Sequence, residues 1–212
     1  YPLIFSTIFQ VRLVRRFFQD RKLRMLDVGC GPGKLIEILR AFFPIERAFG
    51  IDFSDNSVTV CKSKGIDAAK CRVGELKETF NLITAVHVLE HIPDPIQLVK
   101  EIEERLEPGG ILIFTLPNVK SLGRSTFGEN WIGYNTPKHV VNYQKDTLFK
   151  LLQHTNLKVI QYSTRGFYIQ SHPAFTSGVL RHFIRFFDIL PSPLFFNHGD
   201  EHTIIAVKEE SK

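Results

Sequence analysis

Along most of the chain, short apolar runs alternate with stretches in which apolar residues recur every three or four positions. The runs predict strands at residues 24–29, 47–52, 67–72, 80–86, 110–116, 157–163 and 203–207. The spaced stretches predict helices at residues 33–42, 55–64, 95–106 and 145–154. Strands and helices that alternate in this way form a parallel sheet with helices on both faces. The pattern therefore predicts an α/β protein.

The first 22 residues have the pattern of an amphipathic helix, with Ile4, Ile8, Val11, Val14 and Phe18 on one side. Residues 1–24 hold six Arg and Lys and one Asp, an excess of five that equals the net charge of +5 of the whole chain. Three interpretations stay open for this N-terminal basic helix at residues 1–22. The helix would serve as a lid over a pocket, as a dimer surface, or as a patch that contacts an anionic membrane.

Two further segments interrupt the regular alternation. Residues 117–143 form a loop-rich insertion that is too long for a passive connection in a compact domain. Residues 167–196 are rich in aromatic side chains and also carry arginines, so the same three interpretations apply to them. Because long loops commonly act as lids or binding elements, we expect the insertion to lie on the acceptor side of a binding site.

The composition is that of a globular protein. Hydrophobic residues make up 43% and charged residues 23% of the 212 residues, enough for one domain with a substantial core. Three cysteines without CxxC spacing, Cys30, Cys61 and Cys71, favour a reduced, cytoplasmic setting. The longest apolar runs are far shorter than the roughly 20 residues that cross a bilayer. We expect a cytoplasmic monomer or homodimer, with the basic helix as the candidate for peripheral membrane contact.

The stretch LDVGCGPG at residues 26–33 places three glycines directly after a predicted strand. Fixing glycine costs backbone entropy, so the cluster indicates that a ligand approaches the main chain closely. The spacing G-x-G-x-G differs from the G-x-G-x-x-G of dinucleotide sites, and Lys34-Leu35 disfavours a phosphate-binding P-loop. The turn leads into a helix, whose backbone N–H groups and positive end would face the ligand.

Asp52 ends the next predicted strand, 19 residues after Gly33. In a doubly wound sheet this position adjoins the glycine turn, where a carboxylate can accept hydrogen bonds from both ribose hydroxyls. The alternative role is capping of the following helix, which Ser54 or Asp55 could perform equally well. We therefore expect Asp52 to bind a ribose.

Four motifs make this chain resemble the class I S-adenosylmethionine-dependent methyltransferases: LDVGCGPG, GIDFS, HVLEHIPDP and EPGGILIFTLPN. The resemblance covers most of residues 23–165 and extends to the small-molecule and quinone-type O-methyltransferase branch. It implies a Rossmann-like, doubly wound sheet of seven mostly parallel strands, with the last strand antiparallel. It also implies that residues 23–212 form a domain that binds S-adenosylmethionine and releases S-adenosylhomocysteine.

The resemblance also implies which residues bind the cofactor. Asp27 would orient the methionine part, and Asp52 would bind the ribose. Phe53 would lie against adenine, and Glu75, where Asp is commoner in the family, would reach the adenine amino group. The remaining implied cofactor-binding positions belong to the glycine turn and to the end of the fourth strand: Gly29, Cys30, Gly31, Gly33 and His87.

The segment His87-Val-Leu-Glu90-His91 matches two metal-binding patterns. H-x-x-E-H is an inverted zinc-hydrolase signature, which needs both histidines on one face of a continuous helix. An apolar strand precedes it and Pro93 and Pro95 follow, so this helix is not expected. Some quinone-type relatives are thought to bind a divalent ion here, which makes His87, Glu90 and His91 candidate ligands. The alternative is that Glu90 and His91 only structure the loop.

Methyl transfer from a sulfonium needs alignment, exclusion of water and, for many acceptors, a base with a pKa near neutrality. Histidine suits that role, and His91 and His139 are the candidate bases. The stretch ENWIGYNTPKHVVNY resembles a segment that lies over the active site in a subset of the superfamily. Trp131 and Tyr134 are therefore candidate acceptor-binding residues. The alternative is a packed loop anchored by Trp131.

We expect an enzyme that methylates a small-molecule, sugar or lipid-like acceptor, at oxygen in preference to nitrogen or carbon. A nucleic-acid acceptor is disfavoured because the basic charge is confined to one helix and HIPDP stands where a base-flipping tetrapeptide would follow the fourth strand. Two alternatives remain. One is a cofactor-binding scaffold or regulator without catalysis, and the other is a zinc hydrolase that uses His87, Glu90 and His91.

Overall fold

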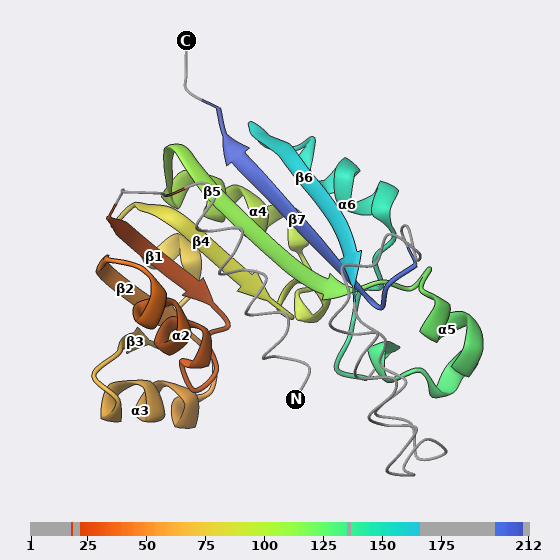
Figure 1. The fold of residues 1–212 in the computed structure, drawn as a ribbon, viewed down its shortest axis with the longest axis horizontal. Helices are drawn as coiled ribbons and strands as arrows, with labels where there is room; N and C mark the ends of the chain where they lie inside the picture. The colour runs from red at the N-terminus through yellow and green to blue at the C-terminus, as the bar shows by residue number, and fades with distance from the viewer. Residues whose placement is uncertain (1–17, 19–21, 135–136, 166–197, 210–212) are drawn as a thin grey trace.

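The computed structural model describes residues 18, 22–134, 137–165 and 198–209. Within this part of the chain the strands form one seven-stranded sheet in the order β3-β2-β1-β4-β5-β7-β6 (Figure 1). The strands are β1 (Leu23–Val28), β2 (Ile45–Ile51), β3 (Asp67–Ala69), β4 (Phe80–Val86), β5 (Leu106–Pro117), β6 (Leu157–Arg165) and β7 (Glu201–Lys208). Only β7 runs antiparallel to both of its neighbours, β5 and β6. The expected mostly parallel, Rossmann-like sheet with an antiparallel last strand is confirmed.

Helices and short 3-10 turns connect these strands. The helices are α2 (Lys34–Phe42), α3 (Asp55–Ser63), α4 (Pro95–Arg105), α5 (Leu122–Phe127) and α6 (Lys145–Leu152). The 3-10 turns are η1 (Val73–Glu75), η2 (Leu89–His91), η3 (Gly128–Asn130) and η4 (Ile132–Tyr134). α4 begins where the Asp94 side chain accepts a hydrogen bond from the Gln97 N–H, with Pro95 at the first helical position. None of the described helices combines the length and apolar character that crossing a bilayer would require.

The sheet separates two hydrophobic cores. Successive strand residues point to opposite faces, so β1 sends Leu26 to one core and Met25 to the other. Helices α4 and α6 cover the first face, and α2 and α3 cover the second. β4 and β5 are apolar on both sides because both of their faces are buried.

The structure gives more order to the insertion at 117–143 than its loop-rich sequence predicts. It contains α5, η3 and η4, and Asn118 forms a bridge to Tyr143 that closes the segment. The Ser121 hydroxyl starts α5 by accepting a hydrogen bond from the Arg124 N–H. The basic helix expected at residues 1–22, apart from Phe18 and Lys22, and the aromatic segment at 167–196 lie outside the described residues.

Candidate functional site

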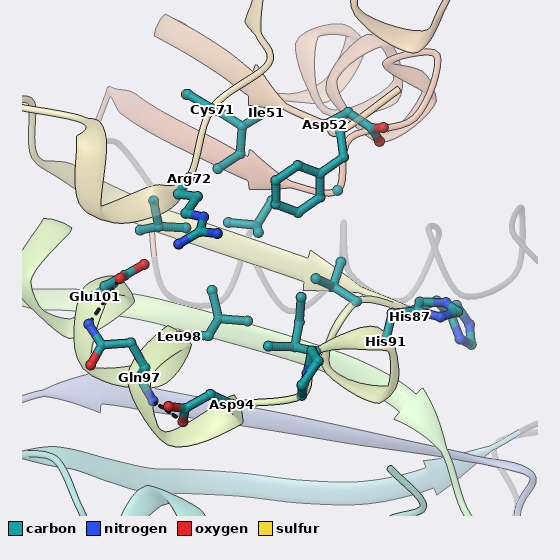
Figure 2. Close-up of a pocket in the computed structure, with 17 residues that line it drawn as sticks. Ile51, Asp52, Cys71, Arg72, His87, His91, Asp94, Gln97, Leu98 and Glu101 are labelled. Atoms are coloured by element: carbon teal, nitrogen blue, oxygen red, sulfur yellow. Dashed lines mark hydrogen bonds between the residues drawn. The ribbon is translucent and has the colours of Figure 1, made fainter. Parts of the chain in front are cut away.

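The order of the strands reverses between β1 and β4, and the loops that follow β1, β2 and β4 meet at this point. Ligands of open α/β sheets bind at such a switch point, beyond the carboxyl ends of the strands. A cavity of about 570 Å³ lies here, with α4 on its far side (Figure 2). The predicted site residues that line it are Gly29, Asp52, Phe53, His87 and His91.

Asp52 is fixed at the cavity wall by two backbone donors. Its Oδ2 accepts a hydrogen bond from the Gly31 N–H at 2.9 Å, and its Oδ1 accepts one from the Ser54 N–H at 2.8 Å. The Ser54 hydroxyl, not Asp52, caps α3. The carboxylate therefore stands beside the glycine turn with its orientation already set, as ribose binding requires.

The glycine turn contributes shape more than hydrogen-bond donors. The N–H groups of Gly29 and Cys30 donate to the Ile51 carbonyl, and that of Gly31 donates to Asp52. These donors are satisfied within the protein, which differs from the expectation that they face a ligand. Gly31 has φ +51°, and a Cβ there would have no neighbour within 4 Å. The open space above this backbone would admit a ligand.

Asp27 lies beneath the turn, 3% exposed, and accepts a hydrogen bond from the Thr84 hydroxyl at 2.6 Å. Burial raises the pKa of Asp27 to about 7, with a further increase from the nearby charge of Asp52 and an opposing effect of the Thr84 hydrogen bond. A carboxyl group held this firmly can orient an ammonium or a water at the end of β1.

Two of the predicted glycine-turn residues point away from the cavity. The Cys30 side chain is buried in the core beneath α2, with its Sγ 3.9 Å from Cys61 Sγ. A Cβ on Gly33 would lie 2.6 Å from Ile66 Cδ1, so glycine is needed there for packing. The side chain of Cys30 and the position of Gly33 therefore shape the turn from behind, and their role as cofactor contacts stays a prediction.

Glu75 does not line the cavity, and its contact with adenine stays a prediction. Its Oε2 accepts a hydrogen bond from the Arg72 N–H at 2.9 Å, which caps η1 and keeps the carboxylate out of the cavity lining. Arg72 and Val73 line the cavity at this end, and Gln97 and Glu101 of α4 face them (Figure 2). Motif spacing missed these residues because the packing of α4 beside η1 brings them there.

His87 is held between two carboxylates. Its Nδ1 lies 3.1 Å from Glu90 Oε1 and its Nε2 lies 2.9 Å from Glu201 Oε1. Its backbone has φ +54°, uncommon for a residue other than glycine, and its N–H donates to the Thr115 carbonyl. Burial alone would lower the pKa of His87, but hydrogen bonds and charge from Glu201 and Glu90 raise it to about 10.

These contacts bear on the alternative in which His87, Glu90 and His91 bind a metal ion. Both ring nitrogens of His87 are engaged by carboxylates, so neither offers a lone pair to a metal. η2 spans only Leu89–His91, so no continuous helix places His87 and His91 on one face. The three residues do not fit a metal ion as a set, and the zinc-hydrolase alternative loses its geometric basis.

The structure instead brings Glu90, His91 and His139 together. Their ligand atoms lie within 4.8 Å of one another, and a carboxylate with two imidazoles could also hold a divalent cation. Nδ1 of His139 lies 2.7 Å from the Gly133 carbonyl, and Nδ1 of His91 lies 2.8 Å from the Lys138 carbonyl. A carbonyl can only accept, so each Nδ1 carries the proton and each Nε2 is left as an acceptor. Burial lowers the pKa of His139.

The insertion holds the other two candidate residues outside the cavity lining. Trp131 is 2% exposed, and its Nε1–H donates to Asp200 Oδ1 at 3.0 Å. Its ring packs over Gly133, where a Cβ would come within 2.6 Å of three ring atoms. The Tyr134 hydroxyl accepts a hydrogen bond from Arg124 Nε. Trp131 therefore anchors the segment that carries His139, and its ring packs against Gly133 within that segment.

Known proteins resemble this chain in sequence. The family model described as a methyltransferase domain matches residues 7–162. A ubiquinone biosynthesis O-methyltransferase of Aliivibrio fischeri (strain ATCC 700601 / ES114) is 26% identical over 151 residues, which cover 64% of this chain and 64% of that protein. A malonyl-[acyl-carrier protein] O-methyltransferase of Bacillus anthracis is 26% identical over 141 residues, which cover 64% of this chain and 51% of that protein. The chain spans less than two thirds of the length of these curated relatives.

Solved structures resemble it in fold. The N-methyltransferase NodS from Bradyrhizobium japonicum WM9, in complex with S-adenosyl-L-homocysteine, has a TM-score of 0.61 and covers 97% of this chain and 88% of its own. At 16% identity this likeness shows a shared fold and not a shared acceptor.

Proposed function

This chain belongs to the methyltransferase-domain family of the class I S-adenosylmethionine-dependent superfamily, and we propose that it methylates an oxygen of a small-molecule, sugar or lipid-like acceptor. The observation that carries the proposal is the continuity of one cavity. Asp52 and the glycine turn line it at one end, and His87 and His91 line it at the other. A donor nucleoside would therefore share this space with His91, whose ring lies 4.8 Å from that of His139.

The proposed roles come from the resemblance to the class I methyltransferases, and the presence of Asp52 and Phe53 in the cavity lining supports two of them. S-adenosylmethionine supplies an already activated methyl group on its sulfonium, so the protein's tasks are alignment and proton removal. Asp52 would bind the ribose, Phe53 would lie against adenine, and Asp27 would orient the methionine part. Gly31 would leave room for the cofactor to approach the backbone.

His139 is the proposed base. Its Nε2 would accept the hydroxyl proton of the acceptor as the methyl group passes from sulfur, which would keep the bonding electron pair, to the acceptor oxygen. His91, whose Nε2 is an acceptor as well, would hold the acceptor hydroxyl in line. The hydrogen bond from His139 Nδ1 to the Gly133 carbonyl fixes the tautomer that this step requires.

Oxygen is the proposed target because both curated relatives described above are named O-methyltransferases. A cluster of a carboxylate and two neutral imidazoles suits an acceptor that donates a hydrogen bond, such as a hydroxyl. The alternative is a protein of the same fold that binds the cofactor as a scaffold or regulator. It shares Asp52 and the glycine turn with the enzyme, so only turnover separates the two.

Calorimetry with S-adenosylmethionine and S-adenosylhomocysteine tests the donor site, and transfer of a labelled methyl group to an acceptor panel tests the reaction. Binding with transfer to a hydroxyl supports the proposal, while binding without transfer to any acceptor favours the scaffold. If neither ligand binds, the donor-site assignment is wrong. A parallel reaction with EDTA tests for a metal ion, because the proposed base mechanism predicts an unchanged rate.

A further inference from the structure

Glu201, His87 and Glu90 form a row behind the cavity, although they come from distant parts of the chain. His87 lies within hydrogen-bonding distance of both carboxylates, at 2.9 Å from Glu201 and 3.1 Å from Glu90. The side chains of Glu201 and Glu90 are only 8% and 2% exposed. Two buried carboxylates are costly without hydrogen-bonding partners, and the ring of His87 lies within hydrogen-bonding distance of both.

The antiparallel direction of β7 explains how Glu201 reaches this site. Pro117, at the carboxyl end of β5, pairs with Glu201, and Thr115 pairs with Thr203. Because β7 runs opposite to β5, it begins at the edge of the sheet where β5 ends. The first residue of β7 therefore lies at the edge that carries the cavity. Glu201 is therefore the contribution of the last strand to the site.

One carboxylate oxygen of Glu90 contacts His87, and the other takes no part in this row. Its Oε1 meets His87, whereas its buried Oε2 has no hydrogen-bond partner among the residues that the structure describes. A carboxylate oxygen of Glu90 belongs to the group of ligand atoms, with His91 and His139, that lie within 4.8 Å of one another. The Glu90 carbonyl also accepts hydrogen bonds from the N–H groups of Val140 and Val141, next to His139. A buried acceptor left unsatisfied is costly, which indicates a use for Oε2.

We propose that Glu201 and His87 are positioning residues, which hold Glu90 so that its second oxygen faces the base His139. The inference rests on the proposed function, because it assigns Glu90 the task of stabilising the imidazolium that forms on His139. Without Glu201, the ring of His87 loses one of its two anchors, and Glu90 is free to turn away from His139. Methyl transfer should then slow while cofactor binding is unchanged.

The test compares Glu201→Ala, Glu90→Gln and the double variant. We expect each single variant to lower kcat by about tenfold or more and to leave the KM for S-adenosylmethionine unchanged. Because Glu201 acts through Glu90, the double variant should be no slower than Glu90→Gln. Glu201→Gln keeps an oxygen that accepts a hydrogen bond from His87 and should recover most of the rate. Glu103→Gln, on the outer side of α4, is the matched control and should keep full activity.

A purely structural role predicts a different result, in which Glu201→Ala lowers the rate by the same factor in the Glu90→Gln background. That outcome, or an unchanged kcat in Glu201→Ala, would overturn the proposal. Crystal structures of the wild type and Glu201→Ala give a readout that does not depend on turnover. Glu90 turned away from His139 in the variant supports positioning, and an unmoved Glu90 refutes it. Absence of methyl transfer by the wild type counts against the proposed function alone.

Discussion

The backbone N–H of Gly31 donates to Oδ2 of Asp52 at 2.9 Å, and this bond joins the turn after β1 to the end of β2. The second oxygen of Asp52 is held by the Ser54 N–H. A carboxylate fixed by two backbone donors loses little side-chain entropy when a ligand binds, because its rotamer is already set. The Asp52 carboxylate is therefore held in one orientation before any ligand binds.

Asp52→Ala should weaken the binding of S-adenosylhomocysteine by about tenfold to a hundredfold, the range expected when hydrogen bonds to a charged group are lost. Calorimetry measures the change, with circular dichroism as the check on folding. Asp55→Ala is the matched control, because Asp55 pairs with Lys70 on the surface, where its side chain is 80% exposed. Equal affinity of wild type and Asp52→Ala would remove Asp52 from the ribose site.

Gly31→Ala and Gly65→Ala separate backbone strain from ligand binding. Both glycines have a positive φ, +51° and +68°, and a Cβ at either would meet nothing within 4 Å. Each substitution should cost about 1–2 kcal/mol in the free energy of unfolding, from strain in the left-handed region alone. Only Gly31→Ala should also weaken cofactor binding. Urea titration and calorimetry test the two effects, and equal affinities for both variants would contradict the assignment of Gly31.

His139→Ala should lower kcat by about a hundredfold to ten-thousandfold, the usual contribution of a general base, and leave the affinity for S-adenosylhomocysteine unchanged. Single-turnover transfer of a labelled methyl group measures the rate. His154→Ala, an exposed histidine that follows α6, is the control. Full turnover in His139→Ala, with normal cofactor binding, would show that another group accepts the proton.

His202 should make the protein less stable in acid. It is 1% exposed, and its Nε2–H donates to the Tyr143 carbonyl, while its Nδ1 accepts from the Tyr162 hydroxyl. Burial lowers its pKa to about 4, although the bond to Tyr143 opposes the shift. Between pH 6.5 and pH 4 the unfolded chain binds a proton at His202 that the folded chain does not bind. The free energy of unfolding therefore decreases as the pH falls, by about 3 kcal/mol at most.

The difference in the free energy of unfolding between wild type and His202→Gln measures the contribution of His202. Asp27, whose pKa is raised to about 7, takes up a proton in the folded state between pH 7 and pH 4, which increases the free energy of unfolding as the pH falls, so the wild-type curve alone would mix two opposite effects. The difference should shrink from pH 7 to pH 4. A difference that stays constant over this range would show that His202 titrates normally in the folded protein.

Trp131→Phe should destabilise the protein by about 1–3 kcal/mol, because the substitution removes a donor to the buried carboxylate of Asp200. Thermal unfolding followed by circular dichroism measures the loss. Tyr134→Phe removes the half-buried hydroxyl that accepts a hydrogen bond from Arg124. This substitution should lower the free energy of unfolding by less than Trp131→Phe does. A smaller loss in Trp131→Phe than in Tyr134→Phe would contradict the role of Trp131 as the anchor of the insertion.

The sequence by itself determined the order of the seven strands and of α2, α3, α4 and α6, whereas α5 and the 3-10 turns were not predicted. Hydrophobic periodicity records burial on one or both faces of an element, so it fixed the sheet-forming runs and the helices to within a few residues. Gly29 and Asp52, which line the cavity, and Gly31, which bonds to Asp52, could be singled out from the sequence because each follows a predicted strand end.

Which residues meet on the proposed acceptor side was decided by the tertiary structure. Glu201 meets His87 across 114 residues because β7 pairs antiparallel with β5, a register that no local pattern encodes. The pairing of His91 with His139 depends on how the insertion folds back over η2. Glu75 and Cys30 fitted a motif by position, but neither lines the cavity, because Glu75 caps η1 and the Cys30 side chain packs in the core.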